Sequence, residues 1–459
     1  MKKGCKAGCG MQEKDQQTDE AMEEKKDPSF EFVKEKIKER PINKRKLLRR
    51  TIITAVMALV FGLIACITFF ALEPIISNWL YPEKEPEIVT FPEEQEETMP
   101  EDMAQTDNDL PGAEPEPEQA PVPPQKVTVY EKVELTTQDY TKLYAELAAI
   151  AAGMQESMVT VSGVTSDTDW FNDVYENKAQ SSGLIIADNG IDLLILATES
   201  KIHDYQQVRI TFHDGTVAEA VKKQTDPNTG LCILAVRLAG LSAETRERAK
   251  PAVLGSSNSL TLLGSPVIAV GSPTGTTGSV CYGMITSNSS GINLVDANYR
   301  LLTTDIYGNA GATGVLINLS GQVVGIIDNT YNASDMKNQI SAIGITELKQ
   351  TIEALSNERE RASIGIHGVD ITAALSESLQ MPRGVCVQSF EMGSPAMICG
   401  IQGNDIITGI GVHVINSMGD LTRALYQYAP GEVVTVTLQR KAQEEYRTME
   451  VEVTLSELK

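Results

Sequence analysis

The chain has 459 residues, which is enough for two or three domains. Its formal net charge is −23 at pH 7, which excludes non-specific nucleic-acid binding because that needs a basic surface. The seven cysteines form neither a disulfide framework nor a metal-ligand pattern, although a pairing of Cys386 with Cys399 stays open. We therefore expect an acidic multidomain protein with no cofactor, no metal ion and no nucleic-acid partner.

An apolar segment near the N-terminus predicts a membrane anchor. Residues 51–72 are 22 residues without a charge, long enough to cross a bilayer core. Basic residues at 44–46 and 49–50 precede this segment, so the positive-inside rule places residues 1–50 in the cytoplasm as a charged head. We expect a single-pass plasma-membrane protein whose C-terminal domains are extracytoplasmic. The alternative is a cleaved signal peptide, which has a shorter apolar region.

An acidic, proline-rich segment follows the predicted anchor. Between Pro82 and Gln125 there are fourteen Asp or Glu residues and one Lys. Such a segment has little apolar surface to bury and strong self-repulsion. Residues 73–125 are therefore predicted to be a disordered linker.

The folded part is expected to start near Lys126, with a helix and then many short strands. Thr136-x-x-Asp139 is typical of a capping box, and apolar residues follow it at helical spacing. After Ser157 the pattern changes to short apolar runs separated by turn signals, which favours an all-β barrel or sandwich. The runs are Met158–Val164, Gly183–Ile186, Leu193–Leu196, Val208–Phe212, Leu231–Val236, Val267–Val270, Val280–Ile285, Val315–Leu319 and Val323–Ile327.

A helix and a charged hinge separate these strands from a second, smaller unit. The helix is predicted over Thr346–Ser356, with Thr346 as its cap, and Arg359–Arg361 reads as the hinge. The second unit has one helix over Met418–Tyr428 and an α+β pattern. Its strands are predicted at Ile364–Ile366, Val385–Gln388, Asp405–Ile410, Val433–Gln439 and Thr448–Leu455.

Several motifs, taken in this order, resemble one family. Val208–Gly215, Ile268–Pro273 and above all Gly314–Ile327 (GVLINLSGQVVGII) are similar to strands and turns of the HtrA/DegP envelope serine proteases. The resemblance implies a mainly β chain, with a trypsin-like double β-barrel at 126–356 and a C-terminal PDZ domain at 357–459. It also implies a serine endopeptidase fold.

The resemblance also implies where a catalytic triad would lie, and none of the three residues is present. Counting from Gly215, the histidine position falls on Ser200, and the aspartate position falls on Gly230. The nucleophile position falls on Ala312, or on Ala310 in a second alignment. Acyl transfer needs a hydroxyl, an imidazole and an orienting carboxylate. We therefore predict a pseudoprotease that is not an active enzyme.

An active serine-type endopeptidase of envelope protein quality control, with displaced catalytic groups, is the alternative. His203 with its neighbour Asp204 is the candidate relocated base. Ser200 and Ser320 are the candidate nucleophiles. This alternative requires a base within hydrogen-bond reach of the nucleophile.

The second unit keeps the features of a peptide-binding PDZ domain. Ser363-Ile364-Gly365-Ile366 resembles the loop whose backbone N–H groups capture a peptide carboxylate, where Gly365 allows close approach. By the same resemblance Ile364, Ile366, Leu421 and Leu425 line a pocket for an apolar terminal side chain. The alternative is that these four residues belong to the core.

These observations give a functional hypothesis. We expect a membrane-anchored HtrA-like pseudoprotease that binds peptides or C-termini of unfolded or envelope proteins, with a sensing, chaperone-like or scaffold role. The resemblance also implies a possible homotrimer. A purely structural scaffold with an unused groove is a third interpretation.

Overall fold

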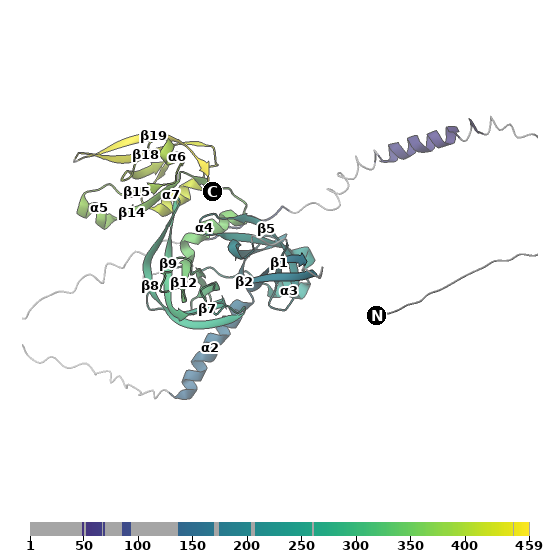
Figure 1. Cartoon of the computed structure of the whole chain (residues 1–459), viewed down its shortest axis with the longest axis horizontal. Helices are drawn as coiled ribbons and strands as arrows, with labels where there is room; N and C mark the ends of the chain where they lie inside the picture. Colours follow the sequence, from purple (N-terminus) through teal and green to yellow (C-terminus); the bar gives the residue numbers. More distant parts are fainter. Residues whose placement is uncertain are drawn as a thin grey trace, which may run out of the picture. The chain divides into compact units, whose positions relative to one another are not determined.

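The structure is a computed structural model, and it falls into two units, residues 1–83 and 84–459, that are described separately (Figure 1). The structure describes residues 48–49, 52–66, 68, 85–92, 136–168, 174–202, 207–258, 261–443 and 445–458.

In the first unit, residues 52–66 are helical and exposed. They form part of the predicted anchor at 51–72; the cytoplasmic head up to residue 47 lies outside the described residues. Within the part of the chain that the structure describes, no helix combines the length and the apolar character that a membrane span requires.

Part of the predicted linker lies against the folded domain. The N–H of Glu87 donates to the carbonyl oxygen of Asn189 at 2.9 Å, and the N–H of Val89 donates to Asn357 Oδ1 at 3.0 Å. Val89 is buried, and Phe91 packs against the same apolar cluster. The expectation of a disordered linker is therefore wrong for residues 85–92, because two apolar side chains supply the burial that the acidic segment otherwise lacks.

The first barrel is closed in the strand order β1-β2-β3-β6-β5-β4. Its central strands carry continuous apolar runs and are buried on both faces, as a barrel wall between a core and a second packing layer requires. The β2–β3 turn holds Gly190 at φ +81°, and Asn189 Oδ1 accepts from the N–H groups of Ile191 and Asp192. The strands are β1 (Met158–Thr168), β2 (Val174–Asp188), β3 (Asp192–Thr198), β4 (Gln207–Thr211), β5 (Val217–Thr225) and β6 (Leu231–Arg237).

The second barrel is closed in the order β10-β11-β12-β9-β8-β7. Its strands β8 and β9 are much longer than the others and pass through two register shifts. Figure 1 shows them as long curved strands that extend from the barrel toward β14. The strands are β7 (Pro266–Ser272), β8 (Ser279–Leu294), β9 (Ala297–Tyr307), β10 (Thr313–Ile317), β11 (Val323–Ile327) and β12 (Gln339–Gly344).

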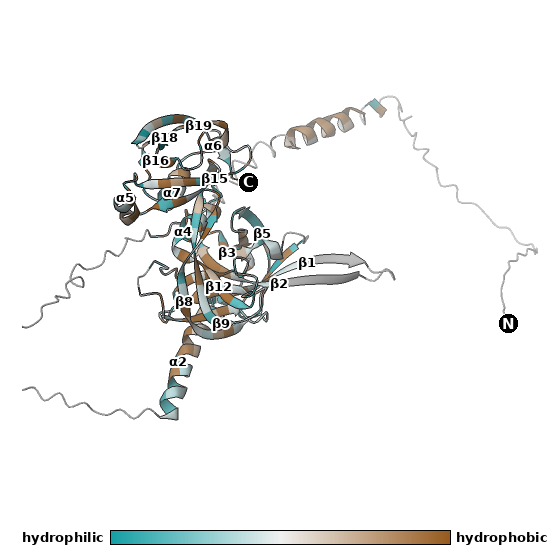
Figure 2. Ribbon diagram, turned by 60° about the vertical axis from the view of Figure 1, so that its left-hand side comes forward, coloured by the Kyte–Doolittle hydropathy of each residue, from teal (hydrophilic) through white to brown (hydrophobic). Residues whose placement is uncertain are grey.

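Two helices close the core that the barrels share. α2 (Thr137–Gln155) starts at the predicted capping box, where the N–H and the hydroxyl of Thr136 both donate to the Asp139 carboxylate. Figure 2 shows hydrophobic residues at the barrel end of α2 and hydrophilic ones at its N-terminal end. α4 (Ile345–Ser356) buries its apolar face in the same cluster. The short elements of this region are η2 (Glu199–Lys201), η3 (Leu238–Gly240) and α3 (Ala243–Arg248).

The C-terminal unit is a five-strand path, β14-β15-β16-β18-β19, with β17 beside β16 and a separate β13–β20 pair. Its own apolar cluster lies between this sheet and α7. The strands are β13 (Ala362–Ser363), β14 (Ile366–Ile371), β15 (Gly384–Phe390), β16 (Ile406–Ile410), β17 (His413–Val414), β18 (Val433–Ala442), β19 (Glu445–Thr454) and β20 (Ser456–Glu457). The helices are α5 (Ala373–Leu379), α6 (Pro395–Ile398) and α7 (Met418–Leu425).

The structure corrects three local predictions. Thr346 lies inside α4, whose N-cap is Gly344, and its hydroxyl instead accepts from the N–H of Ser257. Arg361, the last residue of the predicted charged hinge, is buried. Cys386 and Cys399 are both free thiols, so the pairing that the sequence left open is not formed.

Candidate functional site

Two of the three predicted triad positions meet at one end of the first barrel. Ser200 is exposed in η2, directly after β3, and Gly230 precedes β6. The N–H of Glu199 donates to the carbonyl oxygen of Gly230 at 2.8 Å, because β3 and β6 pair through Thr198 and Leu231. The topology thus brings positions 200 and 230 together, as the resemblance requires, but neither residue is an imidazole or a carboxylate.

Gly230 ends a tight loop with a left-handed backbone. Its φ is +66°, and its N–H donates to the carbonyl oxygen of Asp226 at 2.9 Å. The Asp226 carboxylate accepts from the N–H and the hydroxyl of Thr229 at 3.0 and 2.7 Å. This carboxylate is therefore engaged inside its own loop.

The third position, Ala312, lies on the second barrel and packs in the apolar cluster of that barrel. Ala312 is buried just before β10, and the hydroxyl of its neighbour Thr313 accepts from the N–H of Ser182 in β2 at 3.0 Å. Thr198 and Gly314 line one small cavity of about 10 Å³ at this boundary between the barrels. Residues within two positions of the predicted triad positions, Thr198, Leu231 and Gly314, therefore line one cavity at the boundary between the barrels, which we call the seam.

Three N–H groups of the loop at residues 309–312 donate to acceptors within the protein. The N–H of Ala312 donates to the carbonyl oxygen of Asn309 at 3.0 Å, and the N–H of Gly311 donates to Asn309 Oδ1 at 2.8 Å. The N–H of Asn309 itself donates to the carbonyl oxygen of Pro273 at 2.8 Å. An oxyanion hole needs N–H groups aimed at the reacting oxygen. In this arrangement these donors are used within the protein.

The described residues supply no substitute nucleophile–base pair at this seam. His203 and Asp204 lie outside the described residues. His213 is exposed in the β4–β5 turn, and Ser320 is exposed in the β10–β11 turn. Burial raises the pKa of the Cys232 thiol in β6 to about 12, so this sulfur stays protonated and unreactive at neutral pH.

The predicted carboxylate-binding loop of the C-terminal unit holds a carboxylate. The N–H groups of Ile364 and Gly365 each donate to Asp296 Oδ2 at 2.9 Å, and the N–H of Ile366 donates to Asp296 Oδ1 at 2.9 Å. The Ser363 hydroxyl donates to Asp296 Oδ2 at 2.6 Å. The loop geometry is therefore that of an anion-binding nest, as the motif predicts. No sequence motif marks Asp296, which lies in the β8–β9 turn.

The four predicted pocket residues are all inside the domain. Ile364, Ile366, Leu421 and Leu425 are fully buried members of the apolar cluster between the sheet and α7. Their position between β14 and α7 agrees with a groove floor, and their burial agrees with a core role. Which of the two roles they have stays a prediction.

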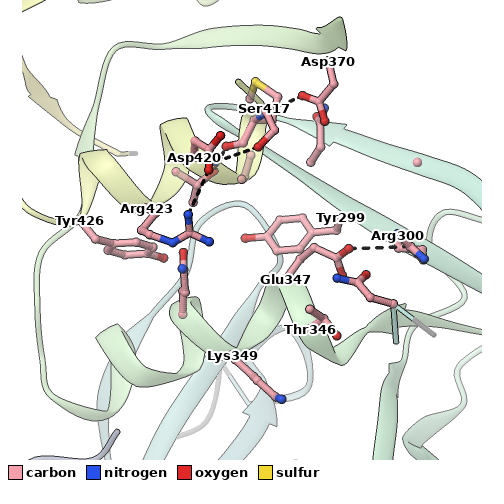
Figure 3. A pocket seen from close by; sticks show the side chains of 18 of the residues that line it. Tyr299, Arg300, Thr346, Glu347, Lys349, Asp370, Ser417, Asp420, Arg423 and Tyr426 are labelled. Atoms are coloured by element: carbon pink, nitrogen blue, oxygen red, sulfur yellow. Dashed lines mark hydrogen bonds and ion pairs between the residues drawn. The ribbon is translucent and has the colours of Figure 1, made fainter. Parts of the chain in front are cut away.

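A second concavity, which sequence reasoning missed, lies between the second barrel and α7 (Figure 3). It has a volume of about 750 Å³ and a largely polar lining. Arg423 pairs with Asp420 at 3.0 Å, and the Asp370 carboxylate accepts from the N–H of Met418 at 2.6 Å. Burial raises the pKa of Asp370, and the nearby charge of Asp420 raises it further. The residues that line this concavity come from elements far apart in the chain, so no local sequence motif predicts it.

Comparison with known proteins identifies both folded parts. Residues 181–326 match the family described as trypsin-like peptidase domain, and residues 362–453 match the PDZ domain family. The serine protease Do-like HtrA of Lactococcus lactis subsp. cremoris (strain MG1363) is 26% identical over 308 residues, which cover 62% of this chain and 74% of that protein. The probable periplasmic serine endoprotease DegP-like of Brucella suis biovar 1 is 28% identical over 285 residues, which cover 61% of this chain and 52% of that protein.

Solved structures of the same family are also similar. An HtrA-type protease AlgW with decapeptide aligns with a TM-score of 0.49 and 17% identity, over 68% of this chain and 98% of that one. The sequence matches and the two domain matches agree with the resemblance that the motifs gave. The chain is therefore a homologue of the HtrA/DegP serine proteases, with a trypsin-like peptidase domain followed by a PDZ domain.

Proposed function

We propose that this protein is an HtrA-like pseudoprotease that binds peptides through its PDZ domain and does not hydrolyse them. The proposal rests on the sequence, which has Ser200, Gly230 and Ala312 at the positions that the family resemblance assigns to the triad. Loss of single triad members costs on the order of 10⁴-fold in rate, and the residual activity comes from the oxyanion hole and from binding. The N–H groups of Asn309, Gly311 and Ala312 are bonded within the protein, which argues against that residual activity as well.

The PDZ domain supplies the binding half of the proposal. Three consecutive backbone N–H groups of Ile364, Gly365 and Ile366 converge on one carboxylate. Strand β14 follows this loop directly, so an extended segment that ends in a carboxylate can add to it as a further strand. Suitable ligands are C-termini or extended segments of unfolded or envelope proteins.

The setting of the protein is also part of the proposal. The uncharged residues 51–72, with their basic flank, support a single-pass anchor that holds the two folded domains outside the plasma membrane. The acidic residues between this anchor and the barrel separate the domains from the bilayer. A homotrimer is proposed on the family relationship alone. In this setting the protein acts as a sensor, chaperone or scaffold in protein quality control.

An unfolded protein substrate tests the proposal directly. The full-length chain, purified in detergent, is incubated with β-casein and in parallel with a fluorescent serine-directed phosphonate. A Ser200→Ala/His203→Ala variant is the matched control. We expect no casein cleavage above that control and no covalent labelling. Cleavage or labelling that the double variant loses would instead establish the alternative, an active endopeptidase with displaced catalytic groups.

A further inference from the structure

The tip of the β8–β9 hairpin occupies the carboxylate-binding loop of the PDZ domain. Leu294 pairs with Ala297, so Val295 and Asp296 form the tip of the hairpin. Asp296 is fully buried and has a left-handed backbone with φ 55°. Its N–H donates to the carbonyl oxygen of Ile366 at 2.8 Å. Backbone and side chain of Asp296 therefore both contact the first residue of β14.

The donors on the carboxylate of Asp296 leave little room for another anion. Besides the N–H groups of Ile364, Gly365 and Ile366, the hydroxyl of Ser363 donates to it. A buried carboxylate is tolerated only when such donors replace its water. Each of these N–H groups is therefore already used, and a second carboxylate cannot bind the loop while Asp296 stays there.

Further bonds hold the hairpin in the groove between β14 and α7. The hydroxyl of Thr422 in α7 donates to the carbonyl oxygen of Asp296 at 2.7 Å, and Arg361 Nη2 donates to the same oxygen at 3.1 Å. On the other side, Asn298 Nδ2 donates to the carbonyl oxygen of Gly368 in β14 at 3.0 Å. A peptide that adds to β14 as a strand needs the carbonyl oxygens of Ile366 and Gly368 as acceptors. The hairpin takes both.

We propose that the Val295-Asp296 tip is an internal ligand of this PDZ domain, with the Asp296 side chain in the place of a peptide C-terminal carboxylate. The inference rests on the proposed peptide binding and names the competitor that any peptide must displace. It also extends the ligand class. The loop accepts a carboxylate presented at a β-turn, so an internal Asp at the tip of a hairpin is a ligand as well as a free C-terminus.

The hairpin tip also bonds to the loop that carries Gly230, so displacement of the tip would change the contacts of that loop. Asn228 Nδ2 donates to the carbonyl oxygen of Val295 at 2.8 Å. Arg361 Nη2 donates to that same oxygen at 3.2 Å, while its Nη1 lies 3.7 Å from Asp226 Oδ1. A ligand that removes Val295 from this position deprives Asn228 and Arg361 of an acceptor. Peptide binding and the seam between the barrels are thereby connected through one turn.

Peptide binding by an Asp296→Asn variant tests the internal ligand. The probe is a pool of fluorescein-labelled decapeptides with four randomised C-terminal residues and a free carboxylate, and the same pool as C-terminal amides is the negative control. Asn keeps the shape of Asp296 but loses the charge that the nest holds. We expect the variant to bind the pool at least about tenfold more tightly than wild type. The reason is that the loop is free to bind a peptide in a larger fraction of the molecules. Asp188→Asn, at the end of β2, is the matched control and should bind as wild type does.

A second variant and a hydrogen-exchange measurement also test the internal ligand. Asn298→Ala removes only the bond to Gly368, so it should strengthen binding about threefold even if Asp296→Asn folds poorly. Hydrogen exchange of the amides of residues 364–366 should become at least about tenfold faster in Asp296→Asn and slow again when the pool is added. A merely structural role of Asp296 would give the faster exchange without this recovery.

The outcomes separate the inference from the function on which it rests. Equal, carboxylate-dependent binding by wild type and Asp296→Asn would leave peptide binding intact and refute the internal ligand. Absence of binding by every variant would refute the proposed peptide binding, and the internal-ligand assignment would fall with it.

Discussion

Gly365 is the residue at which the carboxylate-binding loop is most sensitive to substitution. Its φ is +78°, which disfavours any side chain, and a Cβ at this position would collide with Ser394 at the start of α6. Gly393, which directly precedes Ser394, has nearly the same φ of +75° but open space where its Cβ would lie. Substitution of Gly393 therefore tests backbone strain alone, whereas substitution of Gly365 tests backbone strain together with a steric clash.

We predict that Gly365→Ala destabilises the PDZ domain more than Gly393→Ala does. Gly393→Ala should cost about 1 kcal/mol for the left-handed backbone alone. Gly365→Ala should cost about 1–3 kcal/mol more, since Ser394 has to move and α6 with it. Urea unfolding of both variants, followed by circular dichroism, measures the difference. Equal losses would show that the loop has room for a side chain.

The carboxylate-binding loop was predictable from sequence, and its occupant was not. Ser363–Ile366 is a local motif, and four consecutive residues suffice to recognise it. Asp296 precedes that loop by almost seventy residues, in the segment Leu-Val-Asp-Ala, which carries no glycine or proline to mark a turn. Only the paired strands β8 and β9 bring it to the loop. Likewise, the order of the motifs predicted that two barrels would meet. It did not predict that the N–H groups of Gly311 and Ala312 donate to Asn309, because these bonds depend on the conformation of that residue.

At the scale of elements, the β8–β9 hairpin shows why the strand pattern was incomplete. A strand was predicted only over Val280–Ile285, and the following residues Thr286–Gly291 are small and polar. In the structure β8 continues to Leu294 across two register shifts. Such bulges change which face each side chain points to, so the alternation that predicts a strand is broken. The resulting long hairpin is what reaches the PDZ domain.

The stability of helix α7 depends on pH because a carboxylate, that of Asp370, accepts a hydrogen bond from the first residue of the helix. Asp370 accepts from the N–H of Met418, and burial together with the charge of Asp420 raises its pKa above the ordinary value of 3.8. The folded state therefore binds this proton more tightly than the unfolded state. The bound proton therefore stabilises the folded state. This stabilisation is complete below the pKa that Asp370 has in the unfolded chain, and it is lost as pH rises through the pKa of Asp370 in the folded protein.

We predict that Asp370→Asn stabilises the protein at pH 7 by about 0.5 kcal/mol, a small gain because solvent screens the partly exposed carboxylate. The amide oxygen of Asn keeps the bond from Met418 while the unfavourable charge is removed. The advantage should shrink as pH falls through 3.8, because Asp370 then becomes protonated in the unfolded as well as the folded state. Thermal unfolding at pH 7 and pH 3.5 measures the effect, with Asp335→Asn as the control for loss of one exposed negative charge. A variant less stable than wild type at pH 7 would mean that the helix N-terminus needs the full charge.

At the scale of the whole molecule, Arg361 joins the peptidase-like domain to the PDZ domain. Its side chain is 6% exposed and lies 3.7 Å from Asp226, whose side chain is 3% exposed. The guanidinium also lies over the ring of Tyr426, next to α7, at 5.6 Å. The sequence run Arg359–Arg361, with three charged residues, was predicted to be a charged hinge. The structure buries the last of them because the hairpin tip and the Asp226 loop together supply acceptors that water would otherwise supply.

We predict that Arg361→Met destabilises the protein by about 3 kcal/mol and separates the unfolding of the two domains. The substitution leaves the buried Asp226 without its cation and the carbonyl oxygens of Val295 and Asp296 without one donor. Arg237→Met is the matched control, because Arg237 is 73% exposed and its pair with Asp192 is worth at most about 1 kcal/mol. In urea, Arg361→Met should show two transitions, the PDZ domain unfolding first, where wild type shows one. A single transition at an unchanged midpoint would place the connection between the domains elsewhere, in the hairpin alone, and the Asp296→Asn variant would then be the one expected to separate them.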